Sequence, residues 1–72
     1  MNEKLRMIVA EMLELDPALI TSETSAENQP KWDSLRHMNL IFAIEDAFGI
    51  RFDDAELPKM TSIAAIEHVL GK

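Results

Sequence analysis

The sequence predicts a small all-α fold, a bundle of three main helices and one short helix. Apolar residues recur with helical spacing in three separate segments, near residues 5–13, 35–48 and 63–70. The chain has no cysteine, two glycines and three prolines, so its composition fits neither a disulfide framework nor a turn-rich β-sandwich or barrel. With 72 residues, it is expected to be a single domain, residues 1–72, held together by helix packing.

The first helix is expected at residues 3–15, with Asn2 as its N-cap. It should end before Pro17, because the residue that precedes a proline avoids the α region. One further helical turn is expected at residues 16–20, where Ile20 is placed to anchor the polar segment that follows. The apolar residues of the helix share one face, since they follow the i, i+3, i+4, i+7 pattern: Leu5, Ile8, Val9, Met12 and Leu13.

A long connection, residues 16–33, separates the first helix from the second, and residues 21–30 form its polar part. It shows no apolar periodicity, and loops of this length in compact domains usually serve a function or are disordered. The second helix is expected at residues 34–48, followed by Gly49 in the position that glycine favours after a helix.

The second helix has apolar residues on two faces. One face is expected to point inward, and it contains Leu40, Ile41, Ile44, Ala47 and Phe48, with His37 among them. The other face carries Leu35, Met38 and Phe42, and it is flanked by Arg36, Asn39, Glu45 and Asp46. Such a helix is either covered by neighbours on both sides or presents a docking surface rimmed by charge.

The remaining residues are expected to form an extended link, a short helix and a final helix. The link covers residues 50–52, and the short helix covers residues 53–57 and is stopped by Pro58. Thr61 or Ser62 should cap the final helix. The expected core is Leu5, Ile8, Val9, Met12, Leu40, Ile41, Ile44, Phe48, Ile63, Ile66 and Leu70.

Size and charge exclude several classes of function. A chain this short has no room for a core, a substrate pocket and a catalytic constellation, so it is not expected to be an enzyme. Its formal charge of −6 repels nucleic acid and attracts basic protein surfaces. There is no signal-peptide pattern, and no apolar run reaches the ~18 residues of a membrane span. We therefore expect a cytoplasmic monomer that binds neither nucleic acid nor membrane.

Motifs for metal or phosphate binding are absent from the sequence, so no metal site is expected. There is no HExxH, EF-hand or glycine-rich phosphate loop. His68 is expected at the surface near a helix C-terminus. His37 is expected to be a packed, hydrogen-bonded histidine rather than a base or a ligand.

The junction of the long connection and the second helix carries the most informative segment, Trp32-Asp33-Ser34-Leu35. It has a purely structural interpretation, in which Asp33 or Ser34 is an N-cap worth about 1 kcal/mol and Trp32 is a hydrophobic staple. It also has a functional interpretation. A serine hydroxyl at a helix N-terminus is exposed, and a phosphate attached there meets free backbone N–H groups and the positive end of the dipole. Because the sequence offers this serine no partner base, an external enzyme would have to modify it.

Asp33-Ser34-Leu35 resembles the attachment motif of acyl carrier proteins, in which the serine accepts 4′-phosphopantetheine from coenzyme A. The likeness continues in residues 16–21, 43–50 and 60–63 and covers nearly the whole chain in order. The resemblance implies a non-catalytic carrier whose Ser34 is modified by a phosphopantetheinyl transferase. The thiol of the attached arm would then carry acyl groups as thioesters between acyl-transfer or synthase enzymes.

The resemblance also implies that partners dock on the second helix, through Asp33, Leu35, Arg36, Met38, Asn39, Phe42, Glu45 and Asp46. Some positions depart from the pattern of fatty-acid-synthesis carriers. Arg36 and Asn39 stand where those carriers usually have acids, and Trp32 replaces a small residue. These departures favour a specialised carrier, for polyketide, modified-lipid or aminoacyl transfer, over the bulk fatty-acid carrier. The alternative from another class is an unmodified helical adaptor that binds through Leu35, Met38 and Phe42.

Overall fold

The computed structural model describes residues 2–71, and within this range the fold is all-α, as predicted. No helix in this range is long and apolar enough to cross a membrane. The elements, in chain order, are α1 (Glu3–Leu13), the 3₁₀ turn η1 (Pro17–Leu19), α2 (Ser34–Phe48), the 3₁₀ turn η2 (Leu57–Lys59) and α3 (Ile63–Leu70).

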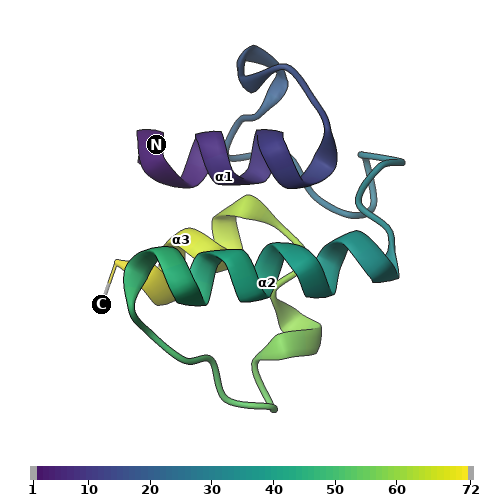
Figure 1. Cartoon of the computed structure of the whole chain (residues 1–72). Helices are drawn as coiled ribbons and strands as arrows, with labels where there is room; N and C mark the ends of the chain where they lie inside the picture. The colour runs from purple at the N-terminus through teal and green to yellow at the C-terminus, as the bar shows by residue number, and fades with distance from the viewer. Residues whose placement is uncertain (1, 72) are drawn as a thin grey trace.

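Helices α1 and α2 lie side by side and run in opposite directions, and α3 packs against this pair (Figure 1). The start of α1 meets the end of α2, where Lys4 Nζ donates to the carbonyl of Ala47 at 2.7 Å and lies 5.0 Å from the centre of the Phe48 ring. At the other end of the pair, Arg36 reaches back to Glu14. Both ends of α2 are therefore tied to α1.

Helix α1 starts as predicted, because the Asn2 side chain accepts from the backbone N–H groups of Lys4 and Leu5. It ends at Leu13, so the prediction of a helix over residues 3–15 was wrong at its C-terminus. Glu14 adopts a left-handed conformation with φ 57°, a conformation that glycine adopts more easily. The physical reason for the early end is that the chain must already be extended at Asp16, which caps η1.

The boundaries of α2 are those predicted. Asp33 is its N-cap and accepts from the backbone N–H of Arg36 at 2.8 Å, whereas Ser34 is already the first helical residue. Gly49 follows the helix with φ 65°. The final helix is capped by Ser62, the second of the expected alternatives, which accepts from the backbone N–H of Ala65 at 3.1 Å.

The short helix expected over residues 53–57 was placed wrongly. Residues 54–56 form a turn, and η2 follows at Leu57–Lys59. Pro58 therefore lies inside this element instead of stopping it. A proline is tolerated there because the backbone N–H groups of the first helical turn need no partner within the helix.

The buried side chains confirm the predicted inward face of each helix. Fully buried members of the predicted set are Leu5, Val9, Leu40, Ile41, Ile44, Ile63 and Ile66. The other predicted core residues are only partly buried against this cluster: Ile8, Met12, Phe48 and Leu70. The prediction omitted several buried residues, Ala10, Leu13, Ile20, Trp32, Phe52 and Met60. Most of these omitted residues lie outside the α-helices, where helical periodicity carries no information.

The long connection between η1 and α2 is tied to the start of α3. Ser25 and Ser62 form an isolated antiparallel bridge. In it, the N–H of Ala26 donates to the carbonyl of Thr61 at 2.8 Å, and the N–H of Ile63 donates to the carbonyl of Thr24 at 2.9 Å. Ile20 anchors the other end of the connection in the core, as expected. This arrangement fixes the chain that leads to α2.

Candidate functional site

Ser34 is exposed at the first position of α2. Within residues 2–71, its hydroxyl has no hydrogen-bond partner, and the backbone N–H groups of Ser34 and Leu35 have none either. These N–H groups lie at the positive end of the helix dipole. The site therefore combines a free hydroxyl with free donors that suit an attached anion.

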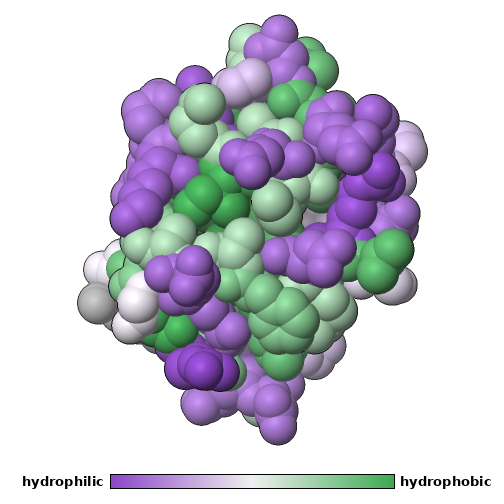
Figure 2. Space-filling view, viewed as in Figure 1, coloured by the Kyte–Doolittle hydropathy of each residue, from purple (hydrophilic) through white to green (hydrophobic). Residues whose placement is uncertain are grey.

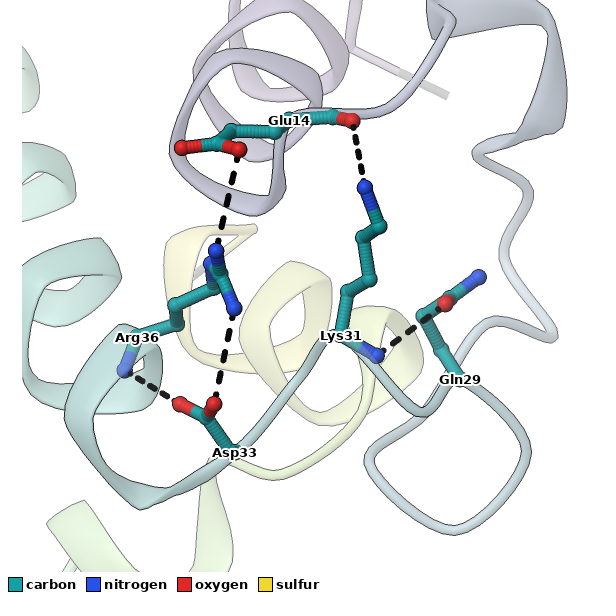
Figure 3. Close-up of polar contacts among 5 residues, drawn as sticks. All are labelled: Glu14, Gln29, Lys31, Asp33 and Arg36. Carbon is teal, nitrogen blue, oxygen red and sulfur yellow. Dashed lines mark hydrogen bonds and ion pairs between the residues drawn. The ribbon is translucent and has the colours of Figure 1, made fainter.

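The residues around Ser34 form a charge-balanced network that joins α2 to the end of α1 (Figure 3). The Arg36 guanidinium lies between two carboxylates, 3.5 Å from Asp33 and 3.7 Å from Glu14. Lys31 Nζ donates to the Glu14 backbone carbonyl at 3.4 Å. Exposed pairs of this kind are worth at most about 1 kcal/mol each. Their main effect is that Arg36 and Lys31 offset the acidic groups beside Ser34.

The ion pair between Arg36 and Glu14 could not be expected from the sequence. Glu14 follows the end of α1, and its side chain is brought to Arg36 only by the packing of α1 on α2. The side chain of Arg36 is 32% exposed and lies at the border of α2 that faces α1. A positive charge near the site was expected, but not its neutralisation by two carboxylates.

Trp32 and His37 form a stacked pair beneath the N-terminal end of α2. Trp32 is only 4% exposed, and its indole N–H donates to Nδ1 of His37 at 3.0 Å. The two ring centres are 6.2 Å apart, with an angle of 27° between the planes. This arrangement confirms both the staple expected of Trp32 and the packed, hydrogen-bonded state expected of His37.

His37 also ties α2 to η2, because its Nε2 lies 3.0 Å from the backbone carbonyl of Leu57. The indole N–H of Trp32 can only donate, so Nδ1 of His37 must accept. The bonding pattern thus assigns the proton of the neutral imidazole to Nε2, which donates to Leu57. Both ring nitrogens are engaged, so His37 is not available as a base for Ser34.

A groove of about 280 Å³ lies beside Ser34. Trp32 and His37 line it on one side, and Met38 lines it along α2. Ala26 and Thr61, which are joined by the backbone bridge described above, complete its wall. None of the fully buried side chains of the helical core lines this groove.

The second apolar face of α2 is exposed, as the helical wheel predicts. The exposed fraction is 73% for Leu35, 37% for Met38 and 57% for Phe42. On the side shown in Figure 2, apolar residues gather over α2 among hydrophilic ones. This face continues away from Ser34 to a second groove of about 450 Å³, lined in part by Phe42 and Asp46.

The polar residues expected to flank this face differ in their exposure. Asn39 and Asp46 are exposed beside the apolar residues. Glu45 is half-buried, and its Oε2 accepts from the backbone N–H of Phe52 at 2.9 Å. The structure thus places Leu35, Met38, Asn39, Phe42 and Asp46 on one free surface, while Glu45 is partly engaged within the fold.

A metal centre is not formed among residues 2–71, where no group of three or more histidine, aspartate or glutamate side chains comes together. His68 is exposed, as expected. Within residues 2–71, no side chain hydrogen-bonds the hydroxyl of Ser34, and both ring nitrogens of His37 are engaged elsewhere.

Comparison with known proteins matches the chain to one family. The family model for the phosphopantetheine attachment site matches residues 3–70. A curated protein of Thermosynechococcus vestitus, described as "Acyl carrier protein", is 36% identical over 61 residues, which cover 85% of this chain and 75% of that protein. The chain therefore belongs to the acyl carrier protein family. The prosthetic group of this chain is phosphopantetheine, and its role is that of a carrier rather than a catalyst.

Proposed function

We propose that Ser34 is the residue that receives 4′-phosphopantetheine, and that this carrier serves a dedicated pathway rather than bulk fatty-acid synthesis. The observation that carries the first part is the exposed, unpaired hydroxyl of Ser34 at the start of α2. The proposal treats residues 1–72 as one carrier domain.

The other serines of the chain are less suitable. Ser62 uses its hydroxyl to cap α3 by accepting from the backbone N–H of Ala65. Ser25 is held in the bridge to Ser62, and Ser22 lies in a turn away from any helix start. Ser34 alone among them combines a free hydroxyl with the N-terminus of a helix longer than two turns.

The chemistry asked of Ser34 is simple. Its oxygen forms a bond to the phosphorus nearest the pantetheine part of coenzyme A, 3′,5′-ADP leaves, and the hydroxyl proton passes to the transferase or solvent. The free N–H groups of Ser34 and Leu35 are the donors that this chain offers to the phosphate oxygens. Once attached, the group supplies a terminal thiol on which acyl or related cargo is held as a thioester.

Mass spectrometry tests the attachment site. Protein incubated with coenzyme A and a phosphopantetheinyl transferase should gain the mass of one arm. Trypsin cleaves after Lys31 and Arg36, and the peptide of residues 32–36 contains Ser34 as its single hydroxyl-bearing residue. The added mass should appear on this peptide. Its appearance on another peptide would refute Ser34, and no gain at all would support the alternative of an unmodified adaptor.

The proposed partners are the transferase and acyl-transfer or synthase enzymes that approach the exposed face of α2. The support is the apolar surface formed by Leu35, Met38 and Phe42, which starts at Ser34. Close to Ser34, Arg36 and Lys31 offset the carboxylates of Asp33 and Glu14. Enzymes that select a carrier by strong negative charge at the start of α2 would find little of it here, which supports a dedicated set of partners.

Adding negative charge at the start of α2 should improve recognition by general fatty-acid-synthesis enzymes. We expect Arg36→Asp combined with Asn39→Glu to raise the rate of acyl transfer roughly tenfold at low salt, because charge complementarity mainly increases the association rate. The gain should shrink at physiological ionic strength, where the screening length is about 8 Å. The measurement is the transfer rate of both proteins at two salt concentrations.

The single change Asn39→Glu is the matched control for this experiment. Arg36→Asp also removes the contacts with Asp33 and Glu14, whereas Asn39 is exposed and makes no side-chain hydrogen bond within residues 2–71. Asn39→Glu should give a smaller gain with the same salt dependence. If the unmodified sequence already works as well as a standard fatty-acid carrier, the dedicated-pathway proposal is wrong.

A further inference from the structure

Glu14 has a backbone conformation that glutamate disfavours. It follows α1 with φ 57° and ψ 48°, and it is the single residue other than glycine with a positive φ among residues 2–71. The turn that it makes is regular, since the N–H of Leu15 donates to the carbonyl of Ala10 at 2.9 Å. Glycine is the residue that such a turn favours at the left-handed position. The backbone therefore does not explain why a glutamate stands here.

Packing does not explain the glutamate either. The side chain of Glu14 is 69% exposed, and its carboxylate forms one ion pair within residues 2–71, with the guanidinium of Arg36 at 3.7 Å. Lys31 also reaches Glu14, but it donates to the backbone carbonyl, which any residue would offer. The contact with Arg36 is thus what a glutamate adds at this position. A residue held in a disfavoured conformation for the sake of one contact points to a functional role of that contact.

The contact completes a hold on Arg36 from two sides (Figure 3). Nη1 of Arg36 lies 3.5 Å from Oδ2 of Asp33, and Nη2 lies 3.7 Å from Oε1 of Glu14. Two nitrogens of one planar group are therefore engaged at once, which sets the orientation of the group. Asp33 belongs to the same turn of the chain as Arg36, so it is Glu14 that draws the guanidinium toward the end of α1.

The orientation of Arg36 matters because Arg36 flanks the exposed apolar face of α2. That face begins with Leu35, which is 73% exposed, and continues through Met38 and Phe42. A partner that covers this face also approaches the first turn of α2. A free cation at that place would repel a basic partner and attract an acidic one, whereas a cation already paired with two carboxylates does little of either.

We propose that Glu14 is a positioning residue of the docking surface, which holds Arg36 against the end of α1 so that the start of α2 presents no free cation. The partner that fits such a surface is apolar and weakly charged where it meets Leu35. The proposal rests on the proposed function, because it names the chemistry of the partner that docks beside Ser34.

Removing the charge of Glu14 at constant size tests this role. The probe is a malonyl-transferring enzyme of fatty-acid synthesis with a basic docking patch, acting on the protein that carries the arm. We expect Glu14→Gln to raise its KM about threefold at low salt with kcat unchanged, because the released Arg36 opposes the patch. A probe enzyme in which one basic docking residue is replaced by glutamate should show the opposite change, a lower KM. A change of the same sign with both probes would contradict the proposal.

Glu11→Gln is the matched control, since Glu11 is exposed on α1 and its replacement removes the same charge. It should alter KM by less than about 1.5-fold, because Glu11 does not contact Arg36. Equal effects of Glu11→Gln and Glu14→Gln would mean that net charge alone matters. In an Arg36→Gln protein, Glu14→Gln should have no more effect than the control, because nothing is left to position. A threefold effect that persists there would show that Glu14 contacts the partner itself, and the positioning role would be refuted.

Stability separates positioning from a role in the fold. Glu14→Gly should raise the melting temperature by about 2–6 °C, because glycine adopts the left-handed conformation without strain. The same variant should raise KM as Glu14→Gln does. Recognition and stability are thus expected to change in opposite directions. A lower melting temperature for Glu14→Gly would show that the glutamate is kept for the fold and would overturn the proposal.

The hold on Arg36 can be followed without any arm on Ser34. In NMR spectra of the unmodified protein, the side-chain N–H signals of Arg36 should shift with Glu14→Gln and stay in place with Glu11→Gln. Unchanged signals with Glu14→Gln would overturn the inference alone. If the proposed function fails instead, the peptide of residues 32–36 gains no mass, while the signals of Arg36 still respond to Glu14→Gln.

Discussion

Replacing Ile44 by alanine is expected to cost about 2–5 kcal/mol of folding free energy, because the change removes a large side chain from a packed core. Ile44 lies near the middle of α2 and is 0% exposed. A chain of 72 residues has only about 4–11 kcal/mol to lose, at ~0.05–0.15 kcal/mol per residue. The variant should therefore show a sizeable unfolded fraction at room temperature. Urea unfolding followed by circular dichroism measures the loss.

Met38→Ala is the matched control, since it truncates a large apolar residue in the same helix. Met38 is 37% exposed and lines the groove beside Ser34, so its truncation leaves no buried cavity. We expect a loss below about 1 kcal/mol. Equal losses in the two variants would mean that the division of α2 into an inward face and an exposed face is wrong.

Replacing Ser34 by alanine is expected to abolish labelling by coenzyme A and a phosphopantetheinyl transferase. The change removes the proposed acceptor oxygen, and no neighbouring side chain of the segment offers another hydroxyl. Stability should hardly change, because Asp33 rather than Ser34 accepts the capping hydrogen bond from Arg36. The sequence alone left open whether Asp33 or Ser34 caps the helix. Because Asp33 is the cap in the structure, Ser34→Ala removes no capping hydrogen bond.

Two controls accompany this experiment. Ser22→Ala should be labelled at the normal rate, since Ser22 lies in a turn remote from any helix start. Asp33→Ala should lower stability by about 0.5–2 kcal/mol through loss of the N-cap. Full labelling of the Ser34→Ala protein would exclude the proposed attachment site, whatever its stability.

Much of the fold follows from short-range signals in the sequence. Asn2, Gly49 and Ser62 act at the helix ends through bonds or backbone angles that involve only nearby residues. Their effects can be predicted without knowing the tertiary structure. The exposed face of α2 was predicted for the same reason, because helical geometry alone separates Phe42 from Ile44.

Other features depend on contacts between distant segments, and sequence patterns do not reveal them. Met60 is buried without any periodic pattern around it, and Arg36 finds Glu14 only after α1 and α2 have packed. The residue in the left-handed conformation is Glu14 and not a glycine, so the sequence does not indicate this turn. At the site, a helix start with Asp33 or Ser34 as the cap was predictable from local geometry, whereas the bond from His37 to Leu57 required the folded chain.

The bridge between Ser25 and Ser62 has a consequence for synthesis of the chain on the ribosome. The stretch around Ser25 emerges early, but its backbone partners at Thr61 and Ile63 are made much later. Until then, the wall of the groove beside Ser34 that Ala26 and Thr61 form together is incomplete. A growing chain therefore presents Ser34 in unfinished surroundings, and the site acquires its final form only when the beginning of α3 has been translated.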